Sequence, residues 1–434
     1  MDDTYIHLVY AGNLSEQGKL FFNNPDEKGV GTSSVLWTLI LAGEKSLGLP
    51  MHTVAKLAGV ASLVTVGLGL YLLLRPILPG MPALVGSLAV ALSGHMLWFA
   101  LSGMETMLFL ALAILALLCY RNLRWGLLGL LLGLLMLARL EGIFLAVAIG
   151  AVDILRHKNI RRGLLLTGVI CTFIGGSWIL YLFLRTGNIL PTSGIGKRFS
   201  NAIGIQAIAG RNQSLALLSL FPALVYPLTW FLYIIEFVLG GIALPPPKLV
   251  INPGLGSIGF PLSIWAILGW AAVILPLCLY CVGWARRSVR KPGWFQDERH
   301  LPLVVFFVWV VLHNLTYMVL FPSIGNASRY GMLNLVALWL ILLFGLWRVD
   351  KPSIKLWLVA GLTVIAFANT LYWNEVYDAN LEHMLQVRIS AADYIRENIP
   401  QSEKCAAYDV GAIRFYSGRP IIDLGGLIDP SLIQ

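Results

Sequence analysis

The chain has 434 residues, of which 58% are hydrophobic and only 12% are charged. A soluble protein of this length carries about twice that charged fraction, and it could not bury so much apolar surface in one water-facing core. Together with a mean hydropathy of +0.77, the composition excludes a soluble enzyme, a disordered regulator and a secreted disulfide scaffold. It predicts an all-α polytopic membrane protein.

The formal net charge of +9 reflects 31 basic and 22 acidic residues. The basic residues gather in short clusters between apolar runs: Arg121 and Arg124; Arg156, Lys158, Arg161 and Arg162; Arg286, Arg287, Arg290, Lys291 and Arg299; Arg348, Lys351 and Lys355. Such clusters are the positive-inside signal, so the surplus indicates orientation in a membrane rather than nucleic-acid binding. The pair Cys278 and Cys281 lies in an apolar run without a second pair or a His cluster, which favours packing over a zinc site.

The first 33 residues are polar and rich in turn formers, and we expect residues 1–33 to form an extracytoplasmic loop. Residues 34–49 are apolar but short and include Glu44 and Lys45, which favours an interfacial helix over a span. Further apolar runs predict spans at about 54–74, 82–100, 104–120, 125–138, 142–155, 163–184, 261–284, 302–321, 331–348 and 354–374. To keep the basic clusters on one side, the segment 214–243 has to cross an even number of times, giving about 10–12 spans in all.

The last part of the chain is more polar, and the sequence divides into a transmembrane region at 1–377 and a small soluble region at 378–434. Residues 380–398 have helical periodicity. They are followed by a strand at 405–408, a short helix at 410–416 and a strand at 420–424, with glycines between them. The alternation of spans places this α/β appendage outside the cytoplasm.

The same alternation places several charged segments on the outer side, although they lie far apart in the sequence. They are the pair Asp2 and Asp3, Glu105, the pair Arg139 and Glu141, Lys197, and the pair Arg329 and Tyr330. A carboxylate can act as a general base and a basic side chain can hold a phosphate, so the common face predicts one site.

Each of these residues also has a purely structural interpretation. Arg139 and Glu141 would form a salt bridge at a helix break, and Glu105 would cap its helix. Arg329 would be an interfacial anchor. The aspartates would be a solvated chain end, or would supply ligands to a divalent cation.

Seven segments, in order, resemble the polyprenyl-phosphate-dependent glycosyltransferases of the C superfamily, and most closely the bacterial branch containing mycobacterial terminal arabinofuranosyltransferases. The similar segments are Asp2-Asp3-Thr4-Tyr5-Ile6 through Asn23, Gly31 to Trp37, Ser102-Gly103-Met104-Glu105-Thr106, Ala138-Arg139-Leu140-Glu141-Gly142, Leu190-Pro191-Thr192 through Lys197, Ser328-Arg329-Tyr330, and Tyr408-Asp409-Val410-Gly411-Ala412 through Asp429. Leu140 stands where the family has proline and Thr192 where asparagine is common. Members also carry a membrane span before the aspartate pair, and this chain begins one residue before it.

The resemblance implies a multi-pass enzyme of the inner or plasma membrane that acts on the cell envelope. One aspartate of Asp2 and Asp3 would deprotonate an acceptor hydroxyl on a glycan, lipid or protein. That oxygen would attack the anomeric carbon with inversion while polyprenyl phosphate departs. Lys197, Arg329 and Arg139 would hold the donor phosphate, with Glu105, Glu141 and Tyr330 beside it.

Two other functions compete with this interpretation. A transporter or flippase for a lipid-linked sugar would place charges near the bilayer midplane and often show inverted repeats. A ligase or polymerase of surface glycans would share the lipid donor but use a long outer loop rich in Arg and His; the long outer candidates here, 185–213 and 240–260, contain no His.

Overall fold

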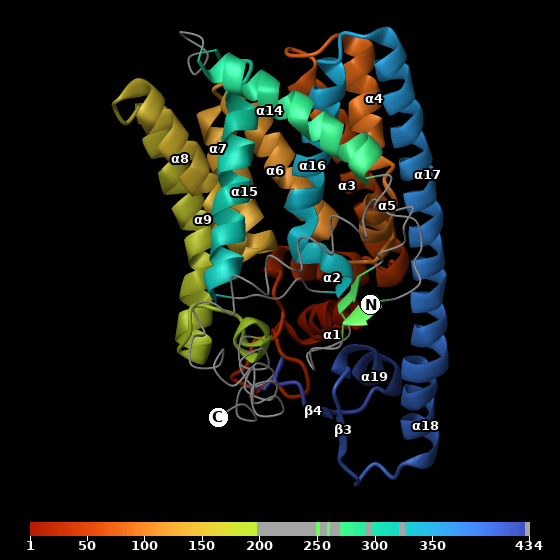
Figure 1. Ribbon diagram of the computed structural model, residues 1–434. Coiled ribbons are helices and arrows are strands. Elements are labelled where there is room, and N and C mark those ends of the chain that lie inside the picture. Colours follow the sequence, from red (N-terminus) through yellow and green to blue (C-terminus); the bar gives the residue numbers. More distant parts are fainter. Residues whose placement is uncertain (198–248, 252–257, 261–269, 291–296, 321–325, 430–434) are drawn as a thin grey trace, which may run out of the picture.

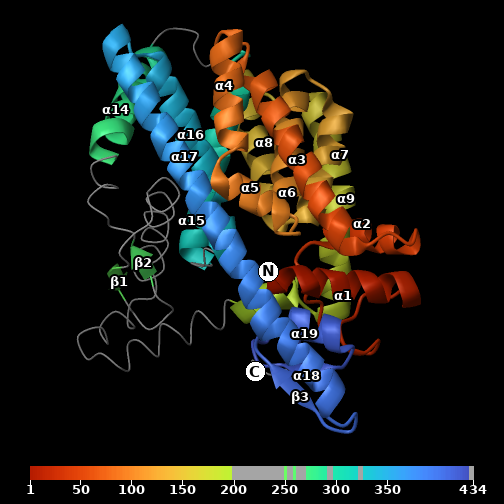
Figure 2. The same ribbon diagram turned by 90° about the vertical axis from the view of Figure 1, so that its right-hand side faces the viewer.

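The computed structural model describes residues 1–197, 249–251, 258–260, 270–290, 297–320 and 326–429. Helices dominate this part of the chain. Most of them stand side by side as an apolar bundle, and two short helices, α1 and α2, lie crosswise at one end of it (Figures 1 and 2). The C-terminal tail, residues 405–428, packs beyond α1 at the same end. The expected segment 214–243 lies outside the described residues.

The described residues contain five helices long and apolar enough to cross a membrane, or six if one bent pair is counted as a span. They are α3 (Met51–Leu74), α9 (Arg162–Thr186), α15 (Leu301–Leu320), α16 (Met332–Trp347) and α17 (Pro352–His383). Shorter bundle helices are α6 (Thr106–Arg121), α7 (Trp125–Ala138), α8 (Ile143–His157) and α14 (Leu275–Val289). The expectation of an all-α multi-pass membrane protein is confirmed at this level.

The expected single span at 82–100 is wrong in detail, because it consists of two helices, α4 (Gly80–Ala91) and α5 (Gly94–Leu101), bent by 55°. At the break, the N–H of Gly94 donates to the side-chain oxygen of Asn369 on α17 (3.0 Å). A side chain of a neighbouring helix thus accepts the hydrogen bond of a backbone N–H that has no acceptor within its own helix because the helix is interrupted. A side chain at residue 94 would also collide with α17, since its Cβ would lie 2.7 Å from the Asn369 carbonyl oxygen.

The expectation of a loop over residues 1–33 is also wrong for its first half, which forms α1 (Asp2–Gln17). Gly18, in a left-handed conformation with φ 68°, ends the helix, and the turn-rich stretch starts only there. Helix α1 is buried on nearly all sides between α2 and the tail. Such a helix has no polar face and so no amphipathic period to reveal it.

The expected interfacial helix is α2 (Val35–Ser46), and Ser34 caps it by accepting the N–H of Trp37. It lies beside α1 and across the bundle axis (Figure 2). Trp37 is fully buried and joins Tyr5, Leu8 and Leu41 in an apolar cluster between these two helices. Helices α1 and α2 therefore form a layer across this end of the bundle.

The helix that leads to the tail continues directly from the last helix of the bundle. Helix α17 continues through a π-helical turn (Met384–Ile389) into α18 (Ser390–Asn398), so the expected boundary between residues 377 and 378 falls inside one long helix. Beyond it, β3 (Cys405–Ala407) and β4 (Ile421–Asp423) pair in parallel and are joined by α19 (Val410–Ser417). The expected strand, helix and strand are present. A further antiparallel pair, β1 (Leu249–Ile251) and β2 (Ile258–Phe260), lies outside the tail.

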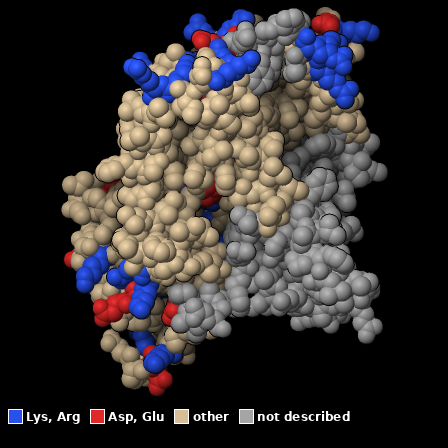
Figure 3. Space-filling view, turned by 90° about the vertical axis from the view of Figure 1, so that its left-hand side faces the viewer, with Lys and Arg blue, Asp and Glu red and all other residues tan. Residues whose placement is uncertain are grey.

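Basic residues gather at the end of the bundle away from α1, α2 and the tail (Figure 3). The surface between the two ends is almost free of charge in this view. One buried acid lies at the basic end and pairs with a basic residue there. Asp153 on α8 accepts hydrogen bonds from Tyr120 and from Arg161. This distribution agrees with the clustering of basic loops in the sequence.

Close packing of α3 against α5 depends on Gly59, and this dependence can be tested. A Cβ at Gly59 would lie 2.0 Å from the backbone oxygen of Ala100, whereas one at Gly67, on the same helix, would lie 3.4 Å from the Ala91 side chain. We expect Gly59→Ala to destabilise the protein by about 1–3 kcal/mol through overpacking. The matched control Gly67→Ala should be neutral or stabilising by up to about 1 kcal/mol, since alanine favours helices. Unfolding midpoints in detergent measure the difference, and equal midpoints would contradict this packing.

Candidate functional site

The two neighbouring aspartates at the start of α1 have different partners. Asp2 is buried, and its carboxylate oxygens accept the backbone N–H groups of Gly411 (2.9 Å) and Ala412 (2.8 Å). Asp2, on α1, therefore caps the N-terminus of α19. Asp409, at the N-cap position of α19 itself, makes no side-chain capping bond. Burial raises the pKa of Asp2, although the two N–H groups oppose this. Of the expected pair, only Asp3 faces the charged cluster.

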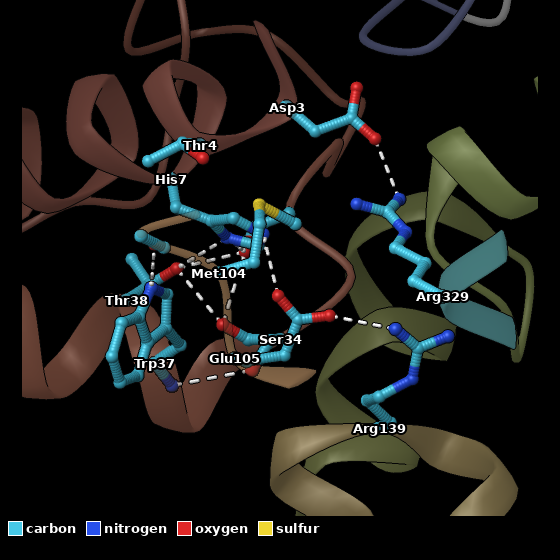
Figure 4. Close-up of polar contacts among 12 residues, drawn as sticks. Asp3, Thr4, His7, Ser34, Trp37, Thr38, Met104, Glu105, Arg139 and Arg329 are labelled. Atoms are coloured by element: carbon cyan, nitrogen blue, oxygen red, sulfur yellow. Dashed lines mark hydrogen bonds and ion pairs between the residues drawn. The ribbon is translucent and has the colours of Figure 1, made fainter. Parts of the chain in front are cut away.

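Asp3 pairs with two basic side chains from distant parts of the chain. Its Oδ2 lies 2.6 Å from Nη2 of Arg329 (Figure 4) and 3.4 Å from Nζ of Lys197. Arg329 and Lys197 also donate to the hydroxyl of Tyr330, each at 3.1 Å. Burial by itself would raise the pKa of Asp3, but Lys197 and Arg329 outweigh it and hold the pKa well below its usual range.

Arg329 has hydrogen-bonding capacity left over. Its side chain is 2% exposed, and only Nη2 is engaged; Nε and Nη1 are buried and have no hydrogen-bond partner among the described residues. An interfacial anchor would keep its guanidinium in water, so this burial argues against that interpretation. Free N–H groups of a buried guanidinium are suited to a phosphate or carboxylate, which the planar fork can bind with two bonds.

A second charged layer surrounds Arg139, at the break between α7 and α8. Its Nη1 donates to Glu105 (2.8 Å) and its Nε to Glu141 (2.6 Å), which also accepts from the hydroxyl of Tyr317 (3.0 Å). The salt bridge expected as the structural interpretation of Arg139 and Glu141 is therefore present. The guanidinium of Arg139 also lies over the ring of Tyr330, 4.7 Å from its centre, which joins this layer to Asp3 and Arg329.

Glu105 precedes α6 but does not cap it with its side chain. The fully buried carboxylate turns instead to Arg139 and to Nε2 of His7, 3.6 Å away (Figure 4). Burial would raise the pKa of Glu105, but the nearby positive charges, Arg139 first among them, together outweigh burial and lower the pKa. Burial also lowers the pKa of His7, more than Glu105 raises it, and the neutral ring is thereby favoured.

The turn that carries Glu105 is fixed between the two crosswise helices. The indole N–H of Trp37 donates to the carbonyl of Gly103 (3.1 Å), and the hydroxyl of Thr4 donates to that of Ser102 (2.9 Å). Gly103 adopts φ 75°, and a Cβ there would meet Thr4 at 2.8 Å, so the turn requires glycine. Helices α1 and α2 thus set the position of the acid.

Sequence reasoning missed His7 and its partners. Nδ1 of His7 lies 2.9 Å from the hydroxyl of Thr32, which in turn lies 2.8 Å from that of Thr38 on α2. A signal was available, because His7 follows Asp3 by four residues and shares its face if the segment is helical. The expectation of a loop there concealed this relation.

All the expected site residues except Asp2 form one network at the α1 end of the bundle. Within the described residues, three carboxylates (Asp3, Glu105, Glu141) face three cations (Lys197, Arg139, Arg329). The carboxylates of Asp2 and Asp3 have different partners and diverge, so they do not jointly face a single ion. The described part of the chain holds no group of three or more His, Cys, Asp or Glu residues suited to a metal.

Residues 374–434 match a family model described as a domain of unknown function (DUF8728). The match covers the end of α17, α18, the strands β3 and β4, and α19. A search of curated proteins finds no match. The matched region supplies the backbone N–H groups that Asp2 accepts, so it directly adjoins the network.

Because Arg139 is enclosed by carboxylates, its removal should be costly. We expect Arg139→Ala to destabilise the protein by about 3–5 kcal/mol, since Glu105 would remain as a buried charge without its main partner. The matched control is Arg396→Ala, whose exposed ion pair with Asp393 should contribute about 0–1 kcal/mol. Denaturant unfolding in detergent measures both. Similar losses for the two variants would mean that Arg139 is not holding a buried acid.

Proposed function

We propose that this chain is a membrane glycosyltransferase that moves a sugar from a polyprenyl-phosphate donor to a hydroxyl on a glycan, lipid or protein acceptor. Asp3 is the general base. The observation that carries the proposal is the pairing of Asp3 with Arg329 at one end of an apolar bundle; two nitrogens of this buried guanidinium have no partner within the described ranges. Carboxylate and guanidinium are the two groups that this reaction needs side by side.

The reaction follows from these groups. The acceptor O–H gives its proton to the Asp3 carboxylate, and the oxygen forms a bond to the anomeric carbon. The bond from that carbon to the phosphate oxygen breaks, and polyprenyl phosphate leaves with the electron pair. Negative charge develops on the phosphate, where Arg329 and Lys197 stabilise it. Attack opposite to the leaving group inverts the anomeric centre.

The low pKa of Asp3 gives the donor a second role. While Arg329 and Lys197 bind Asp3, the carboxylate is a weak base. A donor phosphate that takes up the nitrogens of Arg329 and draws Lys197 toward it offsets the positive charge near Asp3. The pKa of Asp3 then rises and its proton affinity increases. Base strength is in this way linked to the presence of donor.

The membrane setting supports a lipid donor. A prenyl chain stays in the hydrocarbon while its phosphate lies at the bilayer boundary, and the charged network occupies one end of the apolar bundle. The basic end is opposite, which by the positive-inside rule supports an extracytoplasmic site. We propose a multi-pass protein of the inner or plasma membrane with about 10–12 spans once the residues outside the described ranges are included. Its acceptor would belong to the cell envelope.

The two aspartates give a direct test. In a transfer assay with radiolabelled polyprenyl-phosphate sugars, we expect Asp3→Asn to lower kcat by about 10²–10⁴-fold, the usual contribution of a general base. Asp2→Asn should lower it much less, since Asp2 binds backbone N–H groups and does not face Arg329. Protein yield and unfolding midpoint serve as folding controls.

Full transfer by Asp3→Asn would contradict the assignment of the base. A native protein that binds the donor but transfers no sugar, and instead moves it across vesicle bilayers, would replace the proposal with a lipid-linked sugar transporter.

A further inference from the structure

The tail contacts helix α1, which carries Asp3, and the segment that carries its partner Lys197. One contact is the pair of hydrogen bonds from α19 to Asp2, the residue next to Asp3. Adjacent residues of a helix point about 100° apart. Holding the Asp2 side chain against α19 therefore fixes the direction in which Asp3 leaves α1, toward Arg329 (Figure 4) and toward Lys197.

The approach of α19 to α1 is as close as the backbones allow. A Cβ at Gly411 would lie 2.3 Å from the carbonyl oxygen of Asp2 and 3.1 Å from the backbone nitrogen of Ile6. Neither atom can move without moving α1 itself. Glycine at this position is thus a condition for the capping of α19 by Asp2.

A second close contact reaches the segment of Lys197. A Cβ at Gly196 would lie 2.3 Å from the carbonyl oxygen of Gly426 in the tail. Gly196 immediately precedes Lys197, whose ammonium group lies near Asp3. The same part of the tail also presses on Gly31, where a Cβ would meet Ile428 at 2.4 Å.

Further contacts join the tail to α1 and to the loop that follows it. The side-chain amide of Asn23 donates to the carbonyl of Ile421 (2.9 Å), and its oxygen accepts the N–H of Ile421 (3.1 Å). Asn23 thereby pairs with the backbone of β4 as a neighbouring strand would. Val410 and Ile428 of the tail pack with Tyr10 of α1 in one apolar cluster.

We infer that the tail, residues 405–428, is the positioning element of the charged site, and that Asp2 is a positioning residue through which α19 orients Asp3. The contact of Gly196 with Gly426 of the tail orients Lys197. This assigns a role to the part of the chain that matches a domain of unknown function, and it rests on the proposed function only where sugar transfer is the readout.

The test uses the whole chain with three test substitutions and one control substitution. Gly411→Ala and Gly196→Ala each separate one tail contact, while the matched control Gly43→Ala, on α2, adds a Cβ with nothing within 4 Å. Asp2→Asn weakens the capping without a change in size, and it decides the question if Gly411→Ala does not fold.

Hydrogen–deuterium exchange gives a readout that needs no activity. We expect faster exchange over residues 2–10 in Gly411→Ala and Asp2→Asn, and over 192–197 in Gly196→Ala. Exchange in α7 and α9 should stay as in the native protein and in Gly43→Ala. Unchanged protection of residues 2–10 in both Gly411→Ala and Asp2→Asn would overturn the inference.

The pH profile of transfer separates positioning from general loss of structure. The groups that face Asp3 are Arg329, Lys197, His7 and Tyr330, and the charge of the neighbouring Asp2 also acts on it. If Asp3 turns away from its two cations, its pKa rises toward the ordinary value, so the acidic limb of the profile moves to higher pH. We expect this shift with a fall in kcat on the order of 10- to 100-fold in Gly411→Ala. A uniform loss at every pH, without a shift, would overturn the inference.

The two proposals fail in different ways. A native protein that transfers no sugar contradicts the glycosyltransferase proposal, and the exchange measurements still decide the role of the tail. Normal transfer by the native protein, with normal exchange and normal pH profiles in all tail variants, contradicts the positioning role alone.

Discussion

The ion pair between Asp3 and Arg329 is the interaction on which this end of the molecule depends. It joins the first turn of α1 to a residue 326 positions later, and both side chains lie where water is scarce. A buried guanidinium is costly unless it is paired and hydrogen-bonded, so the surrounding side chains are arranged around it. Tyr330 accepts from Arg329 and Lys197, and Arg139 stacks on the same ring. Helices α1 and α2 cover the site at this end of the bundle.

Much of the bundle could be predicted from the sequence because apolar length is a local property. The runs that became α3, α9 and α16 are long and nearly free of charge, and no tertiary information is needed to recognise them. The bend between α4 and α5 could not be predicted this way, since it depends on Asn369 reaching Gly94 from a helix far along the chain. Helix α1 was missed for a related reason: its polar residues find partners in α2 and the tail, which the sequence does not display.

The sequence predicted which residues belong to the site better than it predicted which of them contact one another. Alternation of spans brought Glu105, Arg139 and Arg329 to one face, and the network contains all three. What the sequence could not distinguish was Asp2 from Asp3. Two identical side chains in succession have the same local signals, and their roles diverge only because α19 packs on one side of α1 and Lys197 lies on the other. His7 became recognisable only once the segment was known to be helical.

The unbroken helix from Pro352 to Asn398 has a mechanical consequence. Its 47 residues span about 70 Å at 1.5 Å per residue, more than twice the roughly 30 Å of bilayer hydrocarbon. The part beyond the membrane acts as a rigid arm that carries the tail with it. A change in tilt of the span, such as bilayers of different thickness impose, swings the arm and displaces its far end by more than its near end. Because Asp2 accepts two hydrogen bonds from α19, such a displacement would be transmitted to the first turn of α1.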